Sequence, residues 1–443
     1  STFEEMALAK ALTNALGSSS IDAGLRHDAA LNFGTAKPWL GASVEEVGAA
    51  DAIVVVGADL RMEQPLFANR IRQASRQGAA VALVAAGLSD PYIPKAVSIA
   101  AAPSRQAEVL AQSDVADVLA QGDKKFILIG QQVLMSLYAN SIVAAAQDLA
   151  KAKGAVLGFL GDGANWVGSF VAGVQASAAQ ASGQESVAHG CAVELLASPH
   201  KAVILVGHEP ELDSLGGSKA KVNLHSSDFV VSLTAYAGQA TEYADVLLPI
   251  APFTETSGTF INMAGMAQTF KATVKPLGEC RPAWKVLRVL GNLLGFEQFE
   301  FNSTSDVLDR FLPPDWFTKL NNVVPVAASS ASKPQAPELA AYVPLYHSDS
   351  IVRRAASLQK TKVANAPLVQ ANAATLAGLG VSEGDEIELT DTEGGSLIAK
   401  VGVNPFVANE VLMVPLGKTE VQSLKVFAGE VQAKALASTG VLA

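Results

Sequence analysis

The chain has 443 residues and a formal net charge of -10; 49% of its residues are hydrophobic and 17% are charged. This composition supports large packed cores, so it excludes a wholly disordered chain, and the acidic balance argues against a nucleic-acid partner. Every apolar run is shorter than the roughly 18 residues that a membrane-spanning helix needs, so we expect no direct membrane insertion.

The first residues already have the pattern of a helix, and the chain begins at Ser1 without an initiator methionine. We therefore expect a fragment of a longer protein. The segment 51–84 then has the pattern of a βαβ unit. Residues 53–56 form a β-branched apolar run, Pro65 stands at a favoured first helical position, and Gly78 separates the helix from a second apolar run.

The same alternation recurs along the chain. Further apolar strands are predicted at 125–129, 155–160, 202–206, 229–233 and 245–248. A helix is predicted over 131–153, closed by Gly154. Strands that alternate with helices indicate parallel sheets covered on both faces, so we predict an α/β fold with two doubly wound (Rossmann-like) lobes.

The last part of the chain has a different pattern. Residues 322–339 are rich in Val, Ala, Ser and Pro, which predicts a linker. Apolar and polar residues then alternate over 387–401 around a hairpin turn at Gly394, and another strand is predicted at 411–414. This pattern predicts a small C-terminal β-barrel. The expected domains are two α/β lobes, a linker and the barrel, at 1–160, 161–325, 326–345 and 346–443.

Glycines that follow strands are the first candidates for a site. At Gly57, Gly130 and Gly207 a backbone amide could approach a phosphate, although glycine at such a place also simply ends a strand. Neither GxGxxG nor a P-loop is present in the sequence. His208 follows Gly207 and could face a crevice, or lie in an exposed loop.

Other polar candidates are equally open to a structural reading. His189 and Cys191 flank Gly190, but residues two apart point to different faces of a helix, so we expect structural roles for both. The polar loop 254–259 could bind an anion or cap helices. The basic pair Arg353 and Arg354 is either solvated or contacts an acidic partner or a neighbouring domain.

Cysteine usage limits the metal chemistry. The chain has two cysteines, Cys191 and Cys280, and neither belongs to a CxxC pattern. Iron–sulfur clusters take about four thiolates and structural zinc takes about four ligands. We therefore expect neither kind of site in this chain, and no metal site or catalytic residue is assigned.

Three long stretches resemble the molybdopterin oxidoreductase superfamily. They are Tyr243–Pro249, Thr254–Asn262 and Val274–Trp284, and together they read "YADVLLP", "TETSGTFIN" and "VKPLGECRPAW". The segment 379–385 resembles the superfamily's C-terminal barrel, which closes over the pterin. The resemblance implies a double-psi-like barrel at the C-terminus, of the kind that binds molybdopterin dinucleotide.

Within that superfamily the chain resembles the large iron–sulfur subunit of bacterial NADH-quinone oxidoreductase, respiratory complex I. The similar segments are Gly207–Asp213, Ile21–Arg26 and Ile351–Thr361. The resemblance implies a scaffold in an electron-transfer subunit of the respiratory chain, which passes electrons from NADH to quinone. It also implies iron–sulfur clusters in an absent N-terminal part and contacts with other subunits of the peripheral arm. The fragment itself is expected to be soluble, at the cytoplasmic side of the inner membrane.

Two departures shape the expectation about cofactors. Ala264 and Met266 stand where the resembled family has charged residues, and the segment 22–27 has no thiol or hydroxyl that could bind molybdenum. Molybdopterin is therefore not expected. The crevice is expected to be vestigial, with Gly57, Gly130, Gly207, His208, Thr254 and Asn262 as its remaining candidates. The alternative is an active molybdopterin-dependent oxidoreductase of the formate dehydrogenase or nitrate reductase type.

Overall fold

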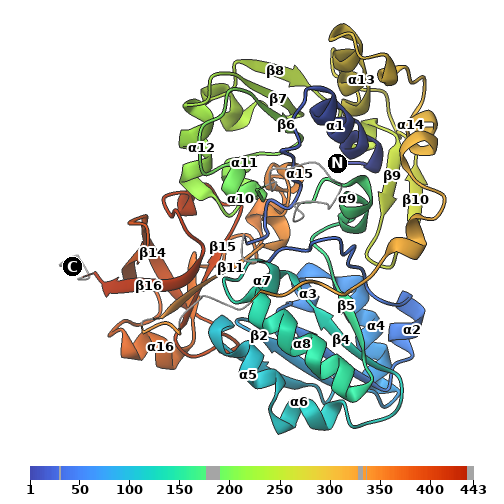
Figure 1. Ribbon diagram of the computed structural model, residues 1–443. Coiled ribbons are helices and arrows are strands. Elements are labelled where there is room, and N and C mark those ends of the chain that lie inside the picture. The colour runs from blue at the N-terminus through green and yellow to red at the C-terminus, as the bar shows by residue number, and fades with distance from the viewer. Residues whose placement is uncertain (29–30, 176–189, 328–332, 336, 437–443) are drawn as a thin grey trace.

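The computed structural model describes residues 1–28, 31–175, 190–327, 333–335 and 337–436. Figure 1 shows three parts: a sheet between helices at the bottom, a smaller sheet with helices at the top, and a barrel at the left. The fold is thus α/β, with parallel sheets and a closed six-stranded β-barrel, as expected at that level. In the described residues, no helix is long and apolar enough to cross a membrane.

The first sheet is parallel throughout, and its strand order is β3-β2-β1-β4-β5. The strands, in sheet order, are Val97–Ala100, Ala80–Ala85, Ala52–Val56, Lys125–Ile129 and Val156–Phe159. Alternate residues of central β1 pack into two cores: Val54 lies in one and Val55 in the other. Burial on both faces explains the continuous apolar run, and the parallel pairing of β1 with β2 confirms the predicted βαβ unit.

Eight helices of the described residues surround this sheet. They are α2 (Val44–Gly48), α3 (Leu60–Glu63), α4 (Pro65–Arg76), α5 (Gln106–Leu110), α6 (Ser113–Val118), α7 (Gln131–Leu134), α8 (Ala139–Lys153) and α9 (Trp166–Ala172). The single helix predicted over 131–153 is wrong, because α7 and α8 are separate. Ser136 Oγ accepts a hydrogen bond of 3.1 Å from the Tyr138 amide, a local turn that competes with the helix. Gly154 ends α8 with φ 63°, as predicted.

The second sheet is smaller and also parallel, with the order β6-β7-β8. Its elements are β6 (Val203–Val206), β7 (Val230–Thr234) and β8 (Val246–Pro249), followed by the hairpin β9 (Gly258–Ile261) and β10 (Ala267–Phe270). The helices of this part are α1 (Phe3–Ala15), α10 (Ala192–Leu195), α11 (Pro210–Asp213), α12 (Gly217–His225), α13 (Ala283–Leu293) and α14 (Thr304–Phe311). Leu8 and Leu12 of α1 join the core of this second part, while Phe3 joins the core of the first. Helix α1 therefore connects the two parts.

The barrel closes in the order β11-β15-β12-β14-β13-β16. Its elements are β11 (Glu338–Tyr342), α15 (Ser350–Arg353), β12 (Val369–Ala371), α16 (Ala373–Gly378), β13 (Glu386–Asp391), β14 (Ser396–Val403), β15 (Val411–Pro415) and β16 (Ala428–Ala435), with α15 in the segment before the barrel's second strand. The antiparallel β13–β14 hairpin matches the prediction. Strand β11 lies inside the segment 326–345, which the sequence predicts to be a linker. The segment forms a strand there because it pairs with β15 and β16, which are distant in sequence.

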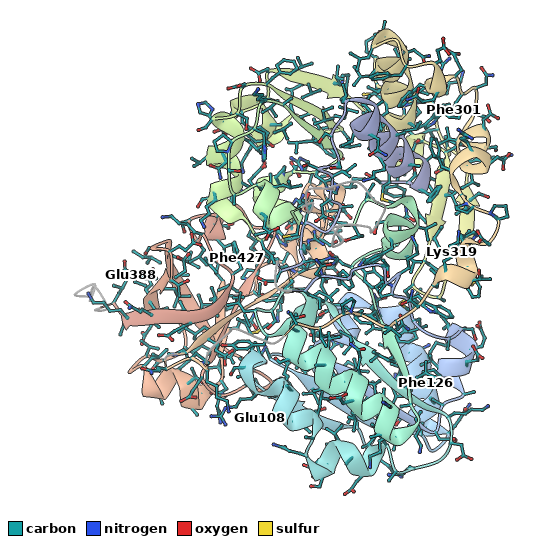
Figure 2. All side chains as sticks on the ribbon, in the orientation of Figure 1. Glu108, Phe126, Phe301, Lys319, Glu388 and Phe427 are labelled. Atoms are coloured by element: carbon teal, nitrogen blue, oxygen red, sulfur yellow. The ribbon has the colours of Figure 1, made fainter. Side chains whose placement is uncertain are left out.

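The barrel packs tightly against the second part at Gly217. Figure 2 shows Phe427 where the barrel meets helix α12, and Glu388 on the barrel away from that contact. A Cβ on Gly217 would lie 2.5 Å from the Leu424 carbonyl oxygen and 3.0 Å from the Phe427 ring. Gly217 also has φ +49°, a conformation that favours glycine.

We predict that Gly217→Ala destabilises the protein by about 2–4 kcal/mol, since left-handed strain and overpacking add. The matched control is Gly380→Ala, because Gly380 has φ +70° but no described atom within 4 Å of its added Cβ. The control should be destabilised only by the left-handed backbone strain, which lowers the free energy of unfolding by about 1 kcal/mol. Urea unfolding of both variants checks this, and equal losses would contradict the packing role of Gly217.

Candidate functional site

Arg26 lies where the two sheets meet the segment that leads into the barrel. Its Nη1 donates to Asp162 Oδ1 at 3.1 Å, and its Nη2 donates to the Ser348 carbonyl at 2.6 Å and to Asp213 Oδ1 at 3.4 Å. Asp162 follows β5 of the first sheet, and Asp213 ends α11 beyond β6 of the second. The carboxyl ends of two parallel sheets thus meet at one arginine, and such ends are where open α/β sheets bind ligands.

Arg353 and Arg354 of the segment before β12 extend this group of charges. Arg353 Nη1 donates to Asp213 Oδ1 at 2.9 Å, and its Nη2 donates to Glu209 Oε2 at 2.8 Å. Arg354 donates hydrogen bonds from Nη1 and Nη2 to the two carboxylate oxygens of Glu209. Its guanidinium lies 4.5 Å from the centre of the Tyr236 ring. Pairing with a neighbouring part of the chain was one of the two readings of this basic pair, and the structure confirms it.

We call these six side chains the arginine hub: Arg26, Asp162, Glu209, Asp213, Arg353 and Arg354. Burial alone would raise the pKa values of Glu209 and Asp213, but the adjacent guanidinium groups hold both below their usual range. The side chain of Arg353 is 6% exposed and that of Glu209 is 7% exposed. The hub is therefore a balanced set of three cations and three anions. It is buried around Arg353, Glu209 and Asp213, and it is more open at Arg354, whose side chain is 33% exposed.

Glu63, near the first sheet, is a carboxyl whose pKa is raised, whereas the pKa values of Glu209 and Asp213 in the hub are lowered. Burial raises the pKa of Glu63 to about 8, and the negative charges of Asp59 and Asp162 act in the same direction, while the Asp59 amide and the Gln132 side chain oppose the shift. The Asp59 amide donates to Glu63 Oε1 at 2.9 Å. Glu63 therefore carries a proton near neutral pH, beside a hub that stays ionised.

Several buried polar atoms of the hub and of other segments have no hydrogen-bond partner within the described part of the chain. They are Gln131 Nε2, Gln132 Oε1, Arg26 Nε, Arg353 Nε and His347 Nδ1. Native proteins pair nearly all buried polar groups, so such atoms mark a place where a further partner would be favourable. They supply both donors and acceptors.

The structure brings together two of the glycines named from the sequence. Gly57 and Gly130 lie at the ends of the neighbouring strands β1 and β4, and a Cβ on Gly130 would lie 2.4 Å from the Gly57 carbonyl oxygen. The Gly57 carbonyl accepts a hydrogen bond of 2.8 Å from the Gln132 amide. These glycines therefore permit the close packing of β1, β4 and α7, which in turn sets the position of Gln131 and Gln132.

The other candidates lie in three different places. Gly207 and His208 follow β6, next to Glu209 of the hub. Thr254 is exposed, and its carbonyl accepts a hydrogen bond of 2.9 Å from the Thr273 amide. Asn262 Oδ1 accepts from the amides of Ala264 and Met266 at 3.0 and 3.1 Å, so this side chain shapes the turn between β9 and β10. The turn accommodates Ala264 and Met266 because its hydrogen bonds to Asn262 come from their backbone amides and not from their side chains.

Metal ligation by this chain has few candidates. His189 lies outside the described residues, and Cys191 is the N-cap of α10. No group of three or more His, Cys, Asp or Glu residues that could hold a metal ion occurs in the ranges that the structure describes. Asp22 is engaged: its Oδ2 accepts from the Ala192 amide at 2.7 Å, and its Oδ1 accepts from the Gly24 amide at 3.0 Å.

Sequence reasoning missed Arg26, Glu63 and Asp213 as site residues. Two signals were available: Glu63 and Asp213 follow strands at the predicted sheet edge, and Arg26 and Asp213 lie in segments that carry the resemblance. Their partners lie far away in sequence, up to 322 residues for the bond between Arg26 and Ser348. Spacing along the chain could not reveal such pairs.

The family model described as "Molybdopterin oxidoreductase" matches residues 1–293. Two proteins from strains of Staphylococcus aureus, both named "Putative formate dehydrogenase", are 35% and 34% identical over 83 residues. Each match covers 19% of this chain and 8% of the relative, so the chain spans a small part of these proteins. The acetylene hydratase from Pelobacter acetylenicus has a TM-score of 0.62 at 12% identity, with 89% of this chain and 81% of that chain covered. The last similarity shows the fold alone.

These comparisons correct three expectations. The identification with the large iron–sulfur subunit of complex I is wrong, because the matching family model is that of molybdopterin oxidoreductases and the partly similar proteins are named as formate dehydrogenases. The scaffold function, with NADH, quinone and the respiratory chain, loses its basis with that identification. The expectation that molybdopterin is absent is contradicted by the family match. It rested on the segment 22–27 and on Ala264 and Met266, whereas a large cofactor can be held by many groups along a crevice.

We predict that Asp213→Asn destabilises the protein by about 3 kcal/mol or more, because Arg26 and Arg353 lose the charge of a shared buried carboxylate. The lowered pKa values of Glu209 and Asp213 mean that this stabilisation is present above the unfolded pKa and is lost as pH falls through the folded pKa. Urea unfolding at pH 7 provides the measurement. Asp315→Asn is the control, since its pair with Lys319 is exposed at the surface and should contribute almost nothing.

We predict that Glu63 makes the protein less stable as pH rises. A carboxyl whose folded pKa is raised to about 8 holds a proton that the unfolded chain has already lost, so stability falls between about pH 4.5 and pH 8. Glu63→Gln should reduce the stability difference between pH 5 and pH 8 by more than about 1 kcal/mol. Thermal or urea unfolding at both pH values checks this, and an unchanged difference would show that Glu63 titrates normally.

Proposed function

Because this chain belongs to the molybdopterin oxidoreductase family, we propose that it works as a molybdopterin-dependent oxidoreductase or as part of one. The observation that carries the proposal is the family match over residues 1–293, which include both parallel sheets and their adjoining carboxyl ends. The partly similar Staphylococcus aureus proteins are named for formate oxidation. The match covers 8% of that protein, so formate is tested first as a reference compound.

The donors and acceptors near the hub fit such a cofactor. A pterin ring is a flat heterocycle with amide-like donors and acceptors, and a dinucleotide adds anionic phosphates. The buried atoms without a described partner offer matching groups: Gln131 and Gln132 on the first sheet's side, Arg26 and Arg353 in the hub. Guanidinium groups suit phosphates, although the Nη atoms of these arginines already bind carboxylates, which leaves Nε.

When bound, the molybdopterin centre would supply two-electron oxidation or reduction. The chain's own residues would position it and manage protons. Glu63 would hold a proton on its carboxyl near neutral pH, and could release it as the charge of the site changes. The hub would keep its charges fixed at the same pH, because its carboxyls stay ionised.

The finer description of the fold belongs to this proposal. We propose that the two parallel sheets are the cores of two doubly wound lobes, near the boundaries given from the sequence, and that the closed barrel is of the double-psi type. We also propose that the protein is located peripherally at the cytoplasmic face of the inner membrane. The net charge of -10 supports the absence of nucleic acid among the partners.

We predict that the full chain, made in cells supplied with molybdenum, carries molybdenum and an extractable pterin at roughly one per chain, as metal analysis and pterin fluorescence would measure. Absence of both, under conditions that load a known molybdenum enzyme, would overturn the proposal. Formate-dependent reduction of a dye then tests the first substrate.

Gln131→Leu gives a sharper version of this test. The substitution removes a buried donor that has no partner in the described part of the chain, so the apo protein should be as stable as before or more stable. Molybdenum content should nevertheless fall by about threefold or more, since that loss corresponds to less than 1 kcal/mol of binding. Gln147→Leu is the control, because Gln147 donates to the Val324 carbonyl elsewhere.

A further inference from the structure

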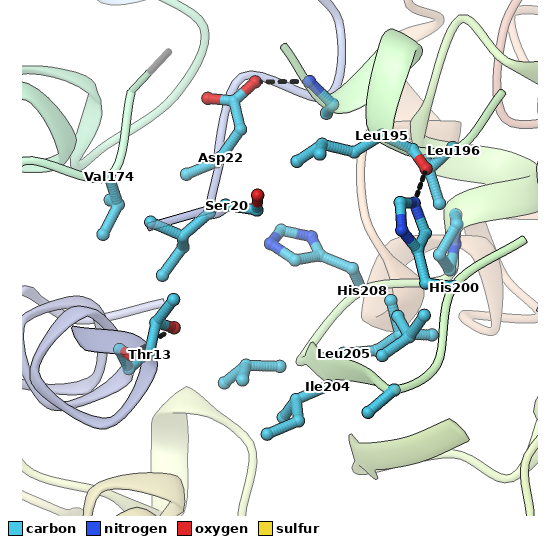
Figure 3. A pocket seen from close by; sticks show the side chains of 18 of the residues that line it. Thr13, Ser20, Asp22, Val174, Leu195, Leu196, His200, Ile204, Leu205 and His208 are labelled. Atoms are coloured by element: carbon cyan, nitrogen blue, oxygen red, sulfur yellow. Dashed lines mark hydrogen bonds between the residues drawn. The ribbon is translucent and has the colours of Figure 1, made fainter. Parts of the chain in front are cut away.

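A partly open pocket lies beside the hub. Its volume is about 590 Å³, within the range of small-molecule sites. Helix α1, strand β6, helix α10 and the segment 18–25 form its walls. Figure 3 shows His208 reaching into this pocket from the end of β6, toward the segment that carries Ser20 and Asp22.

The walls of the pocket are mainly apolar. Leu12 of α1, Leu195 of α10, and Ile204 and Leu205 of β6 all line it. Ile204 is 38% exposed and Leu16, at the end of α1, is 50% exposed, although large aliphatic side chains gain free energy from burial. An apolar ligand in the pocket would cover this surface.

The polar groups of the pocket are few and mostly uncharged. In the described chain β6 pairs with β7 alone. On the edge that faces β7, the Val203 amide donates to the Phe229 carbonyl. On the other edge, the Val206 carbonyl accepts a hydrogen bond from Ser1 Oγ. Because the N–H and C=O of one residue point to the same edge and successive residues alternate between edges, the Ile204 N–H and C=O face the unpaired edge, on the pocket side. They offer one donor and one acceptor.

His208 is the second polar group. Burial lowers the pKa of His208 to about 4, so its imidazole is neutral and has one donor nitrogen and one acceptor nitrogen. The Nε2 of His200 is already engaged in a hydrogen bond within the pocket wall. It lies 2.6 Å from the Leu195 carbonyl oxygen, which can only accept. His208 is thus suited to a carbonyl or hydroxyl group of a ligand.

The charges around the pocket disfavour a small anion. Among the described groups that line it, the carboxyls are those of Glu5 and Asp22. The cations are the Lys201 side chain and the amino group of Ser1, and both belong to exposed residues. A buried carboxylate ligand needs a paired cation, which these side chains do not supply. Formate would also leave most of 590 Å³ unfilled.

We infer that this pocket binds the substrate of the proposed oxidoreductase, and that the substrate is a neutral, mainly apolar organic molecule with a carbonyl or hydroxyl group. The inference rests on the proposed function, and it deepens that function by naming a substrate class. The apolar walls would hold the body of the molecule. His208 would orient its oxygen at the end of the pocket beside Asp22 and the hub, and the Ile204 N–H and C=O would contact the ligand farther back along β6.

The test uses the full chain and a neutral fluorescent probe, N-phenyl-1-naphthylamine, whose emission rises in apolar surroundings. We expect saturable binding, displacement by acetophenone or 1-phenylethanol, and no displacement by sodium formate at equal concentration. Ile204→Trp should weaken probe binding by about tenfold or more, because the indole fills the pocket. Val246→Trp is the matched control and should leave binding unchanged, since Val246 is 36% exposed on β8, the other edge strand of the same sheet.

If Ile204→Trp does not fold, as judged by its circular dichroism and thermal midpoint, Leu16→Trp fills the pocket from α1 instead. Unsaturable binding, displacement by formate as effective as by acetophenone, or unchanged binding in the pocket variants would overturn the inference. These measurements need no molybdenum. A chain that lacks molybdenum but binds the neutral ligands refutes only the proposed function, whereas a loaded chain that does not bind them refutes only the substrate class.

Discussion

Charge that is removed from water must be paired, and in this protein that requirement is met by bringing three distant parts of the chain together. Arg353 is almost completely buried between Asp213 and Glu209, and Arg26 connects Asp213 to Asp162. None of these charges would be tolerable alone at this depth. The relative position of the two sheets and of the segment before β12 therefore follows from the geometry of the arginine hub.

The hub also determines what the surrounding residues can do. Burial keeps His208 uncharged beside the hub, where Asp213 favours its charged form and Arg26 and Arg353 oppose it. Glu63 has no arginine partner in the described residues and keeps its proton instead. The site thus combines fixed charges, which hold the architecture, with neutral acids and bases, which are available for hydrogen bonding and proton transfer.

This division of labour agrees with membership of a family that uses a large cofactor. The unpaired Nε atoms of Arg26 and Arg353 and the side chains of Gln131 and Gln132 are spread over both sides of the junction. A cofactor held in this way depends on many weak contacts along its length. One missing thiol near Asp22 is then a poor guide to whether the cofactor binds, which is why the expectation drawn from that segment was wrong.

The sequence by itself determined the local structure where the pattern is repeated within a few residues. Apolar runs located the strands of both sheets except the edge strand β3. Pro65 marked the first residue of α4, Gly154 marked the end of α8, and the alternation around Gly394 located the β13–β14 hairpin. In each case the cause lies within the segment: a fixed φ, a left-handed glycine, or a side-chain period of two. The break between α7 and α8 escaped this reasoning because it depends on one serine side chain.

Only the tertiary structure decided the site. Strand β11 became a strand because β15 and β16 pair with it, and Glu63 became a proton carrier because burial and two other carboxyl groups raise its pKa. The salt bridges of Arg26 span 136 and 187 residues, and the polar edge of β6 exists because its neighbour stands on one side alone in the described chain. Pairing, burial and electrostatic fields arise between segments that are distant in sequence, so no pattern within a segment could contain them.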